Sequence, residues 1–231
     1  MRWERLLFLH WAWDPRDIQA TLPSGLFVDT FEGKAWLAIA PFFMRRVHPT
    51  GFPRVPWLSD FLELNVRTYV HDGGGLPGIW FYSLTCNQPL AVELARRCFH
   101  LNYVHALMEA RVDQNGICSY KLRRHGFEEA TFRYGSSGQP KPADPGSLEF
   151  FLLERYVLFA AVPQGRLYAG RVHHPPYRLK SALLESWSFL PAIADGFKSP
   201  NRSADHVTLV ENVDVQAWRI RKHSPSPKRR S

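Results

Sequence analysis

Side chains that could bind a ligand or transfer a proton are concentrated in residues 61–70, FLELNVRTYV. Glu63, Asn65, Arg67 and Tyr69 alternate there with apolar residues, as in a half-buried strand whose successive side chains point to opposite faces. A carboxyl group on such a face can exchange a proton with a ligand, and an arginine can hold a carboxylate through two parallel hydrogen bonds. Two alternatives remain open: the polar face lines a closed pocket, or its charges pair with those of neighbouring strands.

Two more arginines, Arg97 and Arg155, are candidates to hold a carboxylate as Arg67 could. Arg155 follows Glu154 within SLEFFLLERYVLFAAV, residues 147–162, which is apolar for most of its length and is predicted as a deeply buried strand. Adjacent strand residues face opposite ways, and buried charges need partners. At least one of these two charged residues is therefore expected to serve structure.

Motifs for metals, nucleotides and covalent nucleophiles are missing from the sequence. It contains no P-loop, GxGxxG, HExxH, GxSxG or paired CxxC pattern. The 3 cysteines lack zinc-type spacing, which argues against a disulfide scaffold and a thiolate metal site. His173 and His174 are adjacent, so on a strand they point to opposite faces and could not easily share one ion. We expect one inside and one outside, and we predict no metal and no cofactor.

Composition and charge favour a soluble protein with a basic end. With 231 residues, of which 45% are hydrophobic, the chain can bury a real core. The N-terminal apolar run is short and lacks a small-residue cleavage site, and no run reaches the length of a membrane span, so we predict a cytoplasmic location and no membrane partner. Much of the net charge of +8 lies in RIRKHSPSPKRRS. Residues 221–231 are predicted as a disordered tail, with contact to nucleic acid or an anionic surface as the less favoured alternative.

Many strands and few helices are expected along the chain, which indicates a mainly β (α+β) fold. Residues 61–70 and 79–86 should form a hairpin across the turn HDGGGLPG. Residues 87–99, NQPLAVELARRCF, have the best helix pattern, with Asn87 as a cap and Pro89 in the first turn. Other strands are expected within 34–47, 117–126, 130–137, 166–174 and 206–218, a short helix within 14–23 and a polar loop over 138–146. No linker divides the pattern, so residues 1–220 are predicted as one domain with a curved antiparallel sheet and one main packed helix.

Several of these segments together resemble a known family. FLELNVRTYV, GIWFYSLTCNQPLAVELARR, SLEFFLLERYVLF and VHHPPYRL, in this order, look like the hallmark segments of the YqjF-like proteins, an uncharacterised bacterial family (domain of unknown function 2071). The likeness covers about residues 2–220. That family is distantly similar to acetoacetate decarboxylase and its relatives. The resemblance therefore implies a cone-shaped antiparallel β-barrel with a largely enclosed pocket.

The resemblance also implies roles for individual residues. Phe61-Leu62-Glu63 is similar to the strand pattern that carries a glutamate in the decarboxylases, which makes Glu63 a candidate pocket acid. Tyr103 falls where those enzymes have the lysine that forms a Schiff base, and a phenol cannot form an imine with a ketone. Tyr103 could instead donate a hydrogen bond to a carbonyl while Glu63 exchanges a proton, and His105 is a further candidate nearby. Lys121, on a different strand, is expected to be solvated.

Three functions stay open at this point. The favoured one is a protein with a small-molecule pocket in a decarboxylase-like barrel that lacks the Schiff-base lysine. The second is a lysine-independent enzyme that performs acid–base chemistry on a small keto or carboxylic acid. The third is a binder of nucleic acid or an anionic surface through the basic tail. The first two share a fold and differ in whether titratable groups converge in the pocket.

Overall fold

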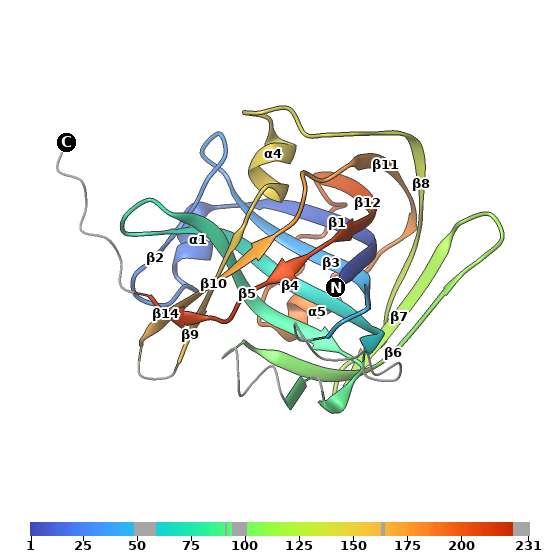
Figure 1. Ribbon diagram of the computed structural model, residues 1–231, viewed down its shortest axis with the longest axis horizontal. Coiled ribbons are helices and arrows are strands. Elements are labelled where there is room, and N and C mark those ends of the chain that lie inside the picture. The colour runs from blue at the N-terminus through green and yellow to red at the C-terminus, as the bar shows by residue number, and fades with distance from the viewer. Residues whose placement is uncertain (49–58, 91, 94–100, 163–164, 224–231) are drawn as a thin grey trace.

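Strands make up most of the protein in the computed structural model, which describes residues 1–48, 59–90, 92–93, 101–162 and 165–223 (Figure 1). The strands are β1 (Arg2–Trp13), β2 (Leu26–Val28), β3 (Ala35–Arg45), β4 (Phe61–Asp72), β5 (Pro77–Cys86), β6 (Tyr103–Val112), β7 (Cys118–Arg124), β8 (Ala130–Lys141), β9 (Val157–Ala161), β10 (Leu167–His173), β11 (Leu179–Ser186), β12 (His206–Asp214), β13 (Gln216–Ala217) and β14 (Arg221–Lys222). The short helices are α1 (Pro15–Gln19), α4 (Leu148–Leu153) and α5 (Leu190–Ala194). The predicted mainly β class is confirmed.

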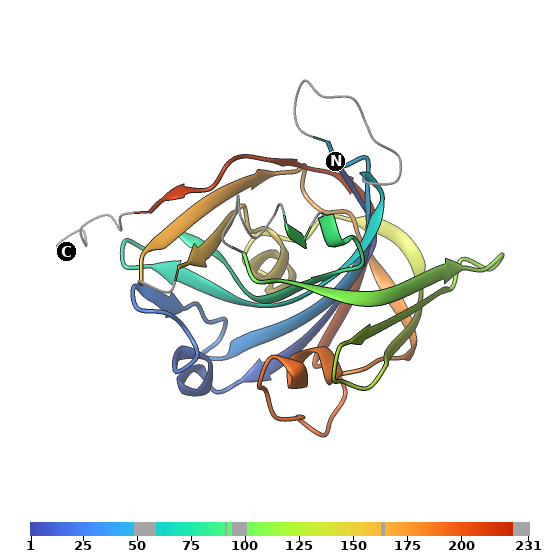
Figure 2. The same cartoon turned by 90° about the horizontal axis from the view of Figure 1, so that it is seen from below.

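The large sheet closes on itself through its hydrogen bonds. Each strand pairs with the next in the order β5-β6-β7-β8-β11-β12-β1-β3-β4, and β4 pairs with β5 again along most of its length. Most pairings are antiparallel, but β5 is parallel to β6 near its C-terminal end and to β9 near its N-terminal end. We call this closed path the first ring. The β6–β7 hairpin extends away from the rest of the molecule (Figure 2).

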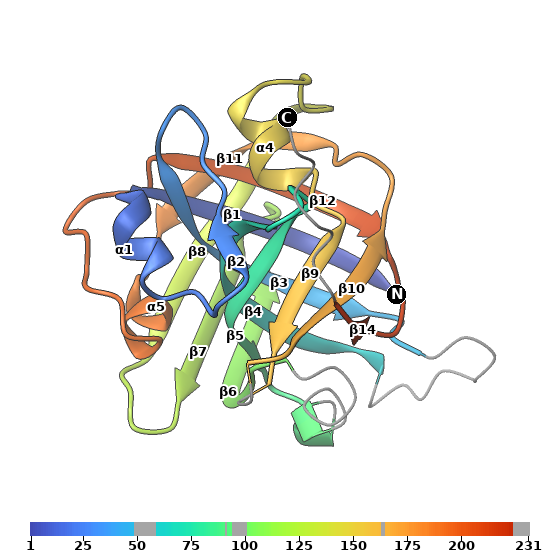
Figure 3. The ribbon, with the colours of Figure 1, turned by 90° about the vertical axis from the view of Figure 1, so that its left-hand side faces the viewer.

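A second closed path shares part of the first. Strand β9 pairs with β5 and β10, and β10 pairs with β13, which continues β12 after a single residue. We call this path the second ring, and the strands common to both, β12, β1, β3, β4 and β5, the shared wall. Helix α4 lies at one end of the second ring in Figures 1 and 3, and Figure 2 shows it within the surrounding strands when they are viewed from the other end.

Alternation along the shared wall serves two cores. In β4, the side chains of Leu62, Leu64 and Val66 join a first core with residues of β6, β7 and β8. Phe61 and Tyr69 face the other way and join a second core, which also contains the α4 residues Leu152 and Leu153. Because both faces of these strands are buried, the wall is apolar over long stretches even though it is largely antiparallel.

Strand β1 also serves both cores, and it changes register near its start. The irregularity falls between Glu4 and Leu9, and Arg5 lies in the left-handed region with φ of 53°. Such a bulge re-aims the residues that follow it. As a result Leu6 and Phe8 pack in the second core, and His10 continues their row.

The prediction of a continuous strand over residues 147–162 is wrong. Residues Leu148–Leu153 form α4, and only Val157–Ala161 form a strand. The helix starts there because the Ser147 side chain accepts a hydrogen bond from the backbone N–H of Phe150, as an N-cap does. Glu154 and Arg155 therefore follow a helix instead of lying on opposite faces of a strand.

Other sequence expectations also need correction. Residues 138–141 continue β8, so the predicted loop is shorter. Of the predicted helix 87–99, the described residues Pro89, Leu90, Val92 and Glu93 are helical, and residues 94–99 lie outside the described part of the chain. Strands β1, β6 and β11 were not expected as strands. The second core contains Leu152 and Leu153 of α4, whose residues were predicted as strand, and also Val92, a helical residue of the predicted helix 87–99.

The C-terminal segment is paired further along than predicted. Arg221–Lys222 form β14 against β10, and the His223 ring lies 2.8 Å from Oδ2 of Asp72, a buried carboxylate. The predicted start of a disordered tail at residue 221 is therefore wrong for residues 221–223. Residues 224–231 lie outside the described part of the chain.

Candidate functional site

The polar row of β4 is buried. Glu63, Asn65 and Arg67 are 3%, 5% and 5% exposed. They share the strand face of Phe61 and Tyr69, which belongs to the second core. The polar face noted in the sequence therefore looks into the protein interior instead of bulk water. A row of buried polar groups in an apolar core is costly unless partners or a function retain it.

The carboxyl group of Glu63 is hydrogen-bonded to a phenol. The hydroxyl of Tyr103, the first residue of β6, donates to Oε2 of Glu63 at 3.0 Å. Burial raises the pKa of the Glu63 carboxyl to about 7, although the hydrogen bond from Tyr103 acts in the opposite direction. Glu63 can therefore both give and take a proton near neutral pH. Burial keeps the pKa of Tyr103 well above 10, so Tyr103 remains a neutral donor.

Cys86 and Tyr120 border Glu63. Cys86 lies opposite Glu63 in the β4–β5 register, and burial raises the pKa of its thiol to about 12, so it is no nucleophile at neutral pH. The hydroxyl of Tyr120 donates to the backbone carbonyl of Glu63 at 2.9 Å, which fixes the strand. The carboxyl group is thus positioned from β6 and β7 as well as from its own strand.

Arg67 is a buried cation that has no counter-ion among the described residues. Its guanidinium lies 5.0 Å from the ring centroid of Phe8 and 5.8 Å from that of Tyr69. Among the described residues it forms no ion pair, and its Nε has no hydrogen-bond partner. The side-chain oxygen of Asn65, on the same face, is also buried without a partner. These are the polar atoms that an anionic or amphipathic ligand would satisfy.

Of the remaining candidates, the two that the structure describes, Arg155 and His105, do not join this row as free groups. Arg155 donates to Oδ2 of Asp29 at 2.6 Å and to the Phe151 carbonyl at 2.7 Å, so its charge is paired within the protein. His105 is exposed on β6. Arg97 lies outside the described residues.

Two other expectations agree with the structure. Lys121 is 56% exposed and forms an ion pair with Glu129, so its side chain is solvated. His173 is exposed while His174 is buried, as expected of neighbours that face opposite ways.

Within the described residues no group of three His, Cys, Asp or Glu side chains could hold a metal ion. No described helix is both long and apolar enough to span a membrane.

Two histidines behind the polar row were not predicted from the sequence. Nε2 of His10 lies 2.9 Å from the Tyr69 hydroxyl, and Nδ1 of His10 lies 3.0 Å from Nδ1 of His206. Both histidines sit in apolar strand sequences, where they gave no signal beyond an isolated polar residue. Only the pairing of β1 with β12, which aligns His10 with His206, brings them together.

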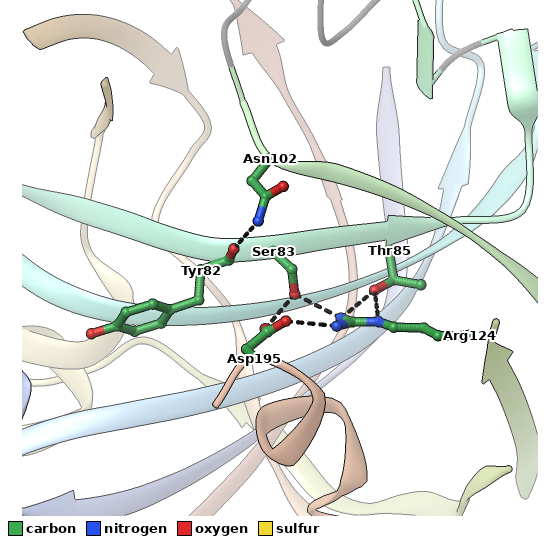
Figure 4. Close-up of polar contacts among 6 residues, drawn as sticks. All are labelled: Tyr82, Ser83, Thr85, Asn102, Arg124 and Asp195. Carbon is green, nitrogen blue, oxygen red and sulfur yellow. Dashed lines mark hydrogen bonds and ion pairs between the residues drawn. The ribbon is translucent and has the colours of Figure 1, made fainter. Parts of the chain in front are cut away.

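A second buried polar cluster, beside the first core, is complete in itself (Figure 4). Arg124 at the end of β7 donates to Oδ1 of Asp195 at 2.6 Å, to Ser83 at 2.6 Å and to Thr85 at 2.9 Å. The Ser83 hydroxyl in turn donates to Asp195. Arg124 and Asp195 are 6% and 8% exposed. Because every charge is paired, we assign this cluster to structure: it ties the segment after α5 to β5 and β7.

Comparison with solved structures identifies the fold. The chain resembles the enduracididine biosynthesis enzyme MppR complexed with pyruvate, with a TM-score of 0.69 and 14% identity over 97% of this chain and 90% of that one. It also resembles acetoacetate decarboxylase from Legionella pneumophila, with a TM-score of 0.61 and 14% identity over 97% and 88% of the two chains. At such low identity these likenesses define the fold, which is that of the acetoacetate decarboxylase-like proteins.

The family follows from the sequence itself. The family DUF2071, described as an uncharacterized conserved protein, matches residues 1–214. The chain is 35% identical over 224 residues to the uncharacterized protein YqjF of Bacillus subtilis (strain 168), covering 96% of this chain and 91% of that protein. The chain belongs to the DUF2071 family. The resemblance noted from the sequence is confirmed, while the predictions on location and partners stay predictions.

Proposed function

We propose that the protein binds a small carboxylic acid at the polar row of β4, with the guanidinium of Arg67 holding the carboxylate. The observation that carries this proposal is the buried Arg67 side chain, which has no counter-ion and an unpartnered Nε among the described residues. Leaving a charge buried and unpaired costs several kcal/mol, roughly 3–5, and a bound carboxylate would offset that cost through a charge-assisted pair of hydrogen bonds.

The rest of the row supports a ligand with a second polar end. Glu63 and Arg67 are four positions apart on the strand, so their Cα atoms are separated by about 13 Å, with Asn65 midway. A cation, an amide and a proton-exchanging carboxyl thus follow one another on one buried face. A small keto acid has complementary groups, a carboxylate and a carbonyl. That the similarly folded MppR is complexed with pyruvate makes pyruvate a suitable first probe.

Calorimetric titration with pyruvate tests this binding. We expect pyruvate to bind and its uncharged analogue pyruvamide, which has nearly the same shape, not to bind. Arg67→Met should remove the binding of pyruvate, whereas Arg171→Met, which removes an exposed arginine on β10, should leave it intact. Equal binding of pyruvate and pyruvamide, or undiminished binding to the Arg67→Met variant, would refute the proposal.

A catalytic role is the second candidate, favoured by the pKa of about 7 of the Glu63 carboxyl beside the Tyr103 phenol. The carboxylate form of Glu63 would take a proton from the carbon next to the keto group. The electron pair of that C–H bond would move onto the keto oxygen, which Tyr103 would stabilise by donating a hydrogen bond. Return of a proton from Glu63 to carbon would complete an exchange that needs no lysine and no cofactor.

Loss of the methyl proton signal of pyruvate in D₂O measures this exchange by NMR. The rate should rise with pH through about 7 as Glu63 ionises, and it should fall to the uncatalysed rate in Glu63→Gln. Binding without exchange would leave the protein a carboxylate binder and refute the catalytic candidate alone.

A further inference from the structure

Four side chains form a continuous contact path behind the proposed carboxylate site. The Tyr69 hydroxyl lies 2.9 Å from Nε2 of His10, Nδ1 of His10 lies 3.0 Å from Nδ1 of His206, and Nε2 of His206 lies 3.6 Å from Oε1 of Glu149. They come from β4, β1, β12 and α4. We call Glu149, His206, His10 and Tyr69 the relay.

The two ends of the relay lie in different surroundings. At the inner end, Tyr69 is fully buried and its ring lies 5.8 Å from the Arg67 guanidinium. At the outer end, Glu149 is 42% exposed, and Glu149 and His206 both line an open groove of about 290 Å³ between α4, β8, β11 and β12. The relay therefore connects the interior of the second ring to solvent.

Because the outer end of the relay is ionised, it determines which group donates and which accepts in each hydrogen bond of the relay. Hydrogen bonds, first of all from its own backbone N–H, lower the pKa of Glu149, so it is a carboxylate that only accepts. Burial lowers the pKa of both His206 and His10, so each is a neutral ring with one N–H. The proton of His206 then lies on Nε2 toward Glu149, and its Nδ1 must accept from His10.

The same reasoning carries inward to the phenol. Because His10 donates through Nδ1, its Nε2 has no proton and must accept from the Tyr69 hydroxyl. The hydroxyl proton of Tyr69 is thus turned away from Arg67, toward which only an oxygen lone pair is left. In this state Tyr69 has no donor to offer a carboxylate.

Protonation of His206 reverses this order. A doubly protonated ring donates from both nitrogens, so Nδ1 of His206 would donate to Nδ1 of His10. His10 would then carry its single proton on Nε2 and donate to the Tyr69 oxygen. The Tyr69 hydroxyl proton would be released from His10 and could turn toward the side of Arg67. One proton enters at His206, and no other proton is gained or lost.

We propose that Tyr69 is a further ligand-contacting residue of the Arg67 site, and that His206, acting through His10, positions its hydroxyl group. While His206 is neutral the hydroxyl donates to His10, and once His206 is protonated it donates to the carboxylate held by Arg67. This inference rests on the proposed carboxylate site. By linkage, carboxylate affinity rises as the pH falls through the pKa of His206, which lies below 6.5.

Other charged and titratable groups face the relay and enter its pH dependence. Arg155 lies 5.7 Å from the Tyr69 ring. Burial is the main influence on the pKa values of Tyr177 and His174, and the charge of Arg67, which lies nearby, acts to lower both. Glu63, on the same face of β4, has a pKa of about 7 and also titrates in this range. A test must therefore follow the histidines individually or compare variants in which these groups are unchanged.

Nitrogen NMR of ¹⁵N-histidine-labelled protein without ligand tests the positioning step directly. From about pH 8 to about pH 5, we expect His10 to change from the Nδ1–H to the Nε2–H tautomer as His206 gains its proton. Glu149→Gln should move that change to lower pH because the charge of Glu149 raises the pKa of His206. Glu185→Gln, at an exposed carboxylate of β11, is the matched control. A His10 tautomer that stays the same throughout the titration of His206 overturns the inference.

Pyruvate titrations at about pH 5.5 and about pH 7.5 test the contact with Tyr69. A hydrogen bond to a charged group predicts about tenfold tighter binding at the lower pH. That gain should exceed the gain in Tyr69→Phe and in His206→Asn, whose amide replaces Nδ1 but does not titrate. Glu63 titrates in all three proteins, so its contribution cancels. Equal gains in all three overturn the role of Tyr69, whereas absence of pyruvate binding at either pH overturns the proposed function and leaves the positioning step to the NMR result.

Discussion

Replacing Glu63 with glutamine changes one atom in a side chain that is 3% exposed, and its effect on stability should depend on pH. In the folded protein burial raises the pKa of Glu63 to about 7 from an ordinary value of 4.5. Such a group contributes stability that is present below pH 4.5 and lost as the pH rises through about 7. The size of the shift corresponds to about 3 kcal/mol. Glutamine cannot ionise, so the variant should escape this loss.

Urea unfolding of the native sequence and Glu63→Gln at about pH 5 and about pH 8.5 measures the difference. At the higher pH the variant should be more stable by about 3 kcal/mol, and at the lower pH the two proteins should differ by about 1 kcal/mol or less. Tyr103 can still donate its hydrogen bond to the amide oxygen of glutamine, so the packing is retained. Glu109→Gln, at an exposed residue of β6, shows what an exchange of glutamate for glutamine does by itself.

The result that contradicts this reasoning is a variant that is less stable at both pH values by the same amount. That outcome would mean that the Glu63 carboxylate has a stabilising positive partner in the folded protein. Glu63 would then be part of a structural ion pair, and the catalytic candidate would lose its base.

Three further changes test other parts of the structure. Asp195→Asn leaves Arg124 buried without an anion, so urea unfolding should show a loss of about 3–5 kcal/mol, whereas Glu129→Gln, which breaks an exposed pair, should cost less than about 1 kcal/mol. In Gly78→Ala the new Cβ would lie 2.6 Å from a ring carbon of Phe159 and 2.8 Å from the Val157 carbonyl, so the melting temperature should fall clearly; Gly73→Ala, where the nearest atom is 3.7 Å away, should change it little. Acetoacetate with borohydride should give no adduct by mass spectrometry, and a mass increase on any lysine would reinstate the Schiff-base mechanism.

The parts of the fold that the sequence predicted are those with a strong local signal. Residues 61–70 alternate strictly and 79–86 follow a glycine-rich turn, and both are strands of one hairpin. The run 147–162 carries no period, because an apolar run reads alike for a buried helix and a buried strand. There the cap at Ser147 was the informative residue. Strand β1 lacks such a signal, because its apolar residues serve two cores and do not alternate with polar ones.

The candidate site divides in the same way. Strand alternation singled out Glu63, the family resemblance made it a pocket acid and added Tyr103, and the structure places the two in contact. Arg67 is buried without a counter-ion among the described residues because the neighbouring strands and α4 supply none, and no local sequence pattern records this. His10 and His206 are 196 residues apart, so their contact follows from strand register alone.

Because β4 belongs to the shared wall, its polar row and the side chains that stabilise the first core lie on opposite faces of the same strand. Its odd-numbered positions from 61 to 69 face the second core and carry the polar row, while the even-numbered Leu62, Leu64 and Val66 complete the first core. Substitutions in the polar row can therefore alter the proposed binding site without touching the packing of the other ring. A single-residue insertion in β4 would do the opposite, because it would present the polar row to one core and the leucines to the other. Within the family, we expect this strand to vary by substitution in the polar row and hardly ever by a change in its length.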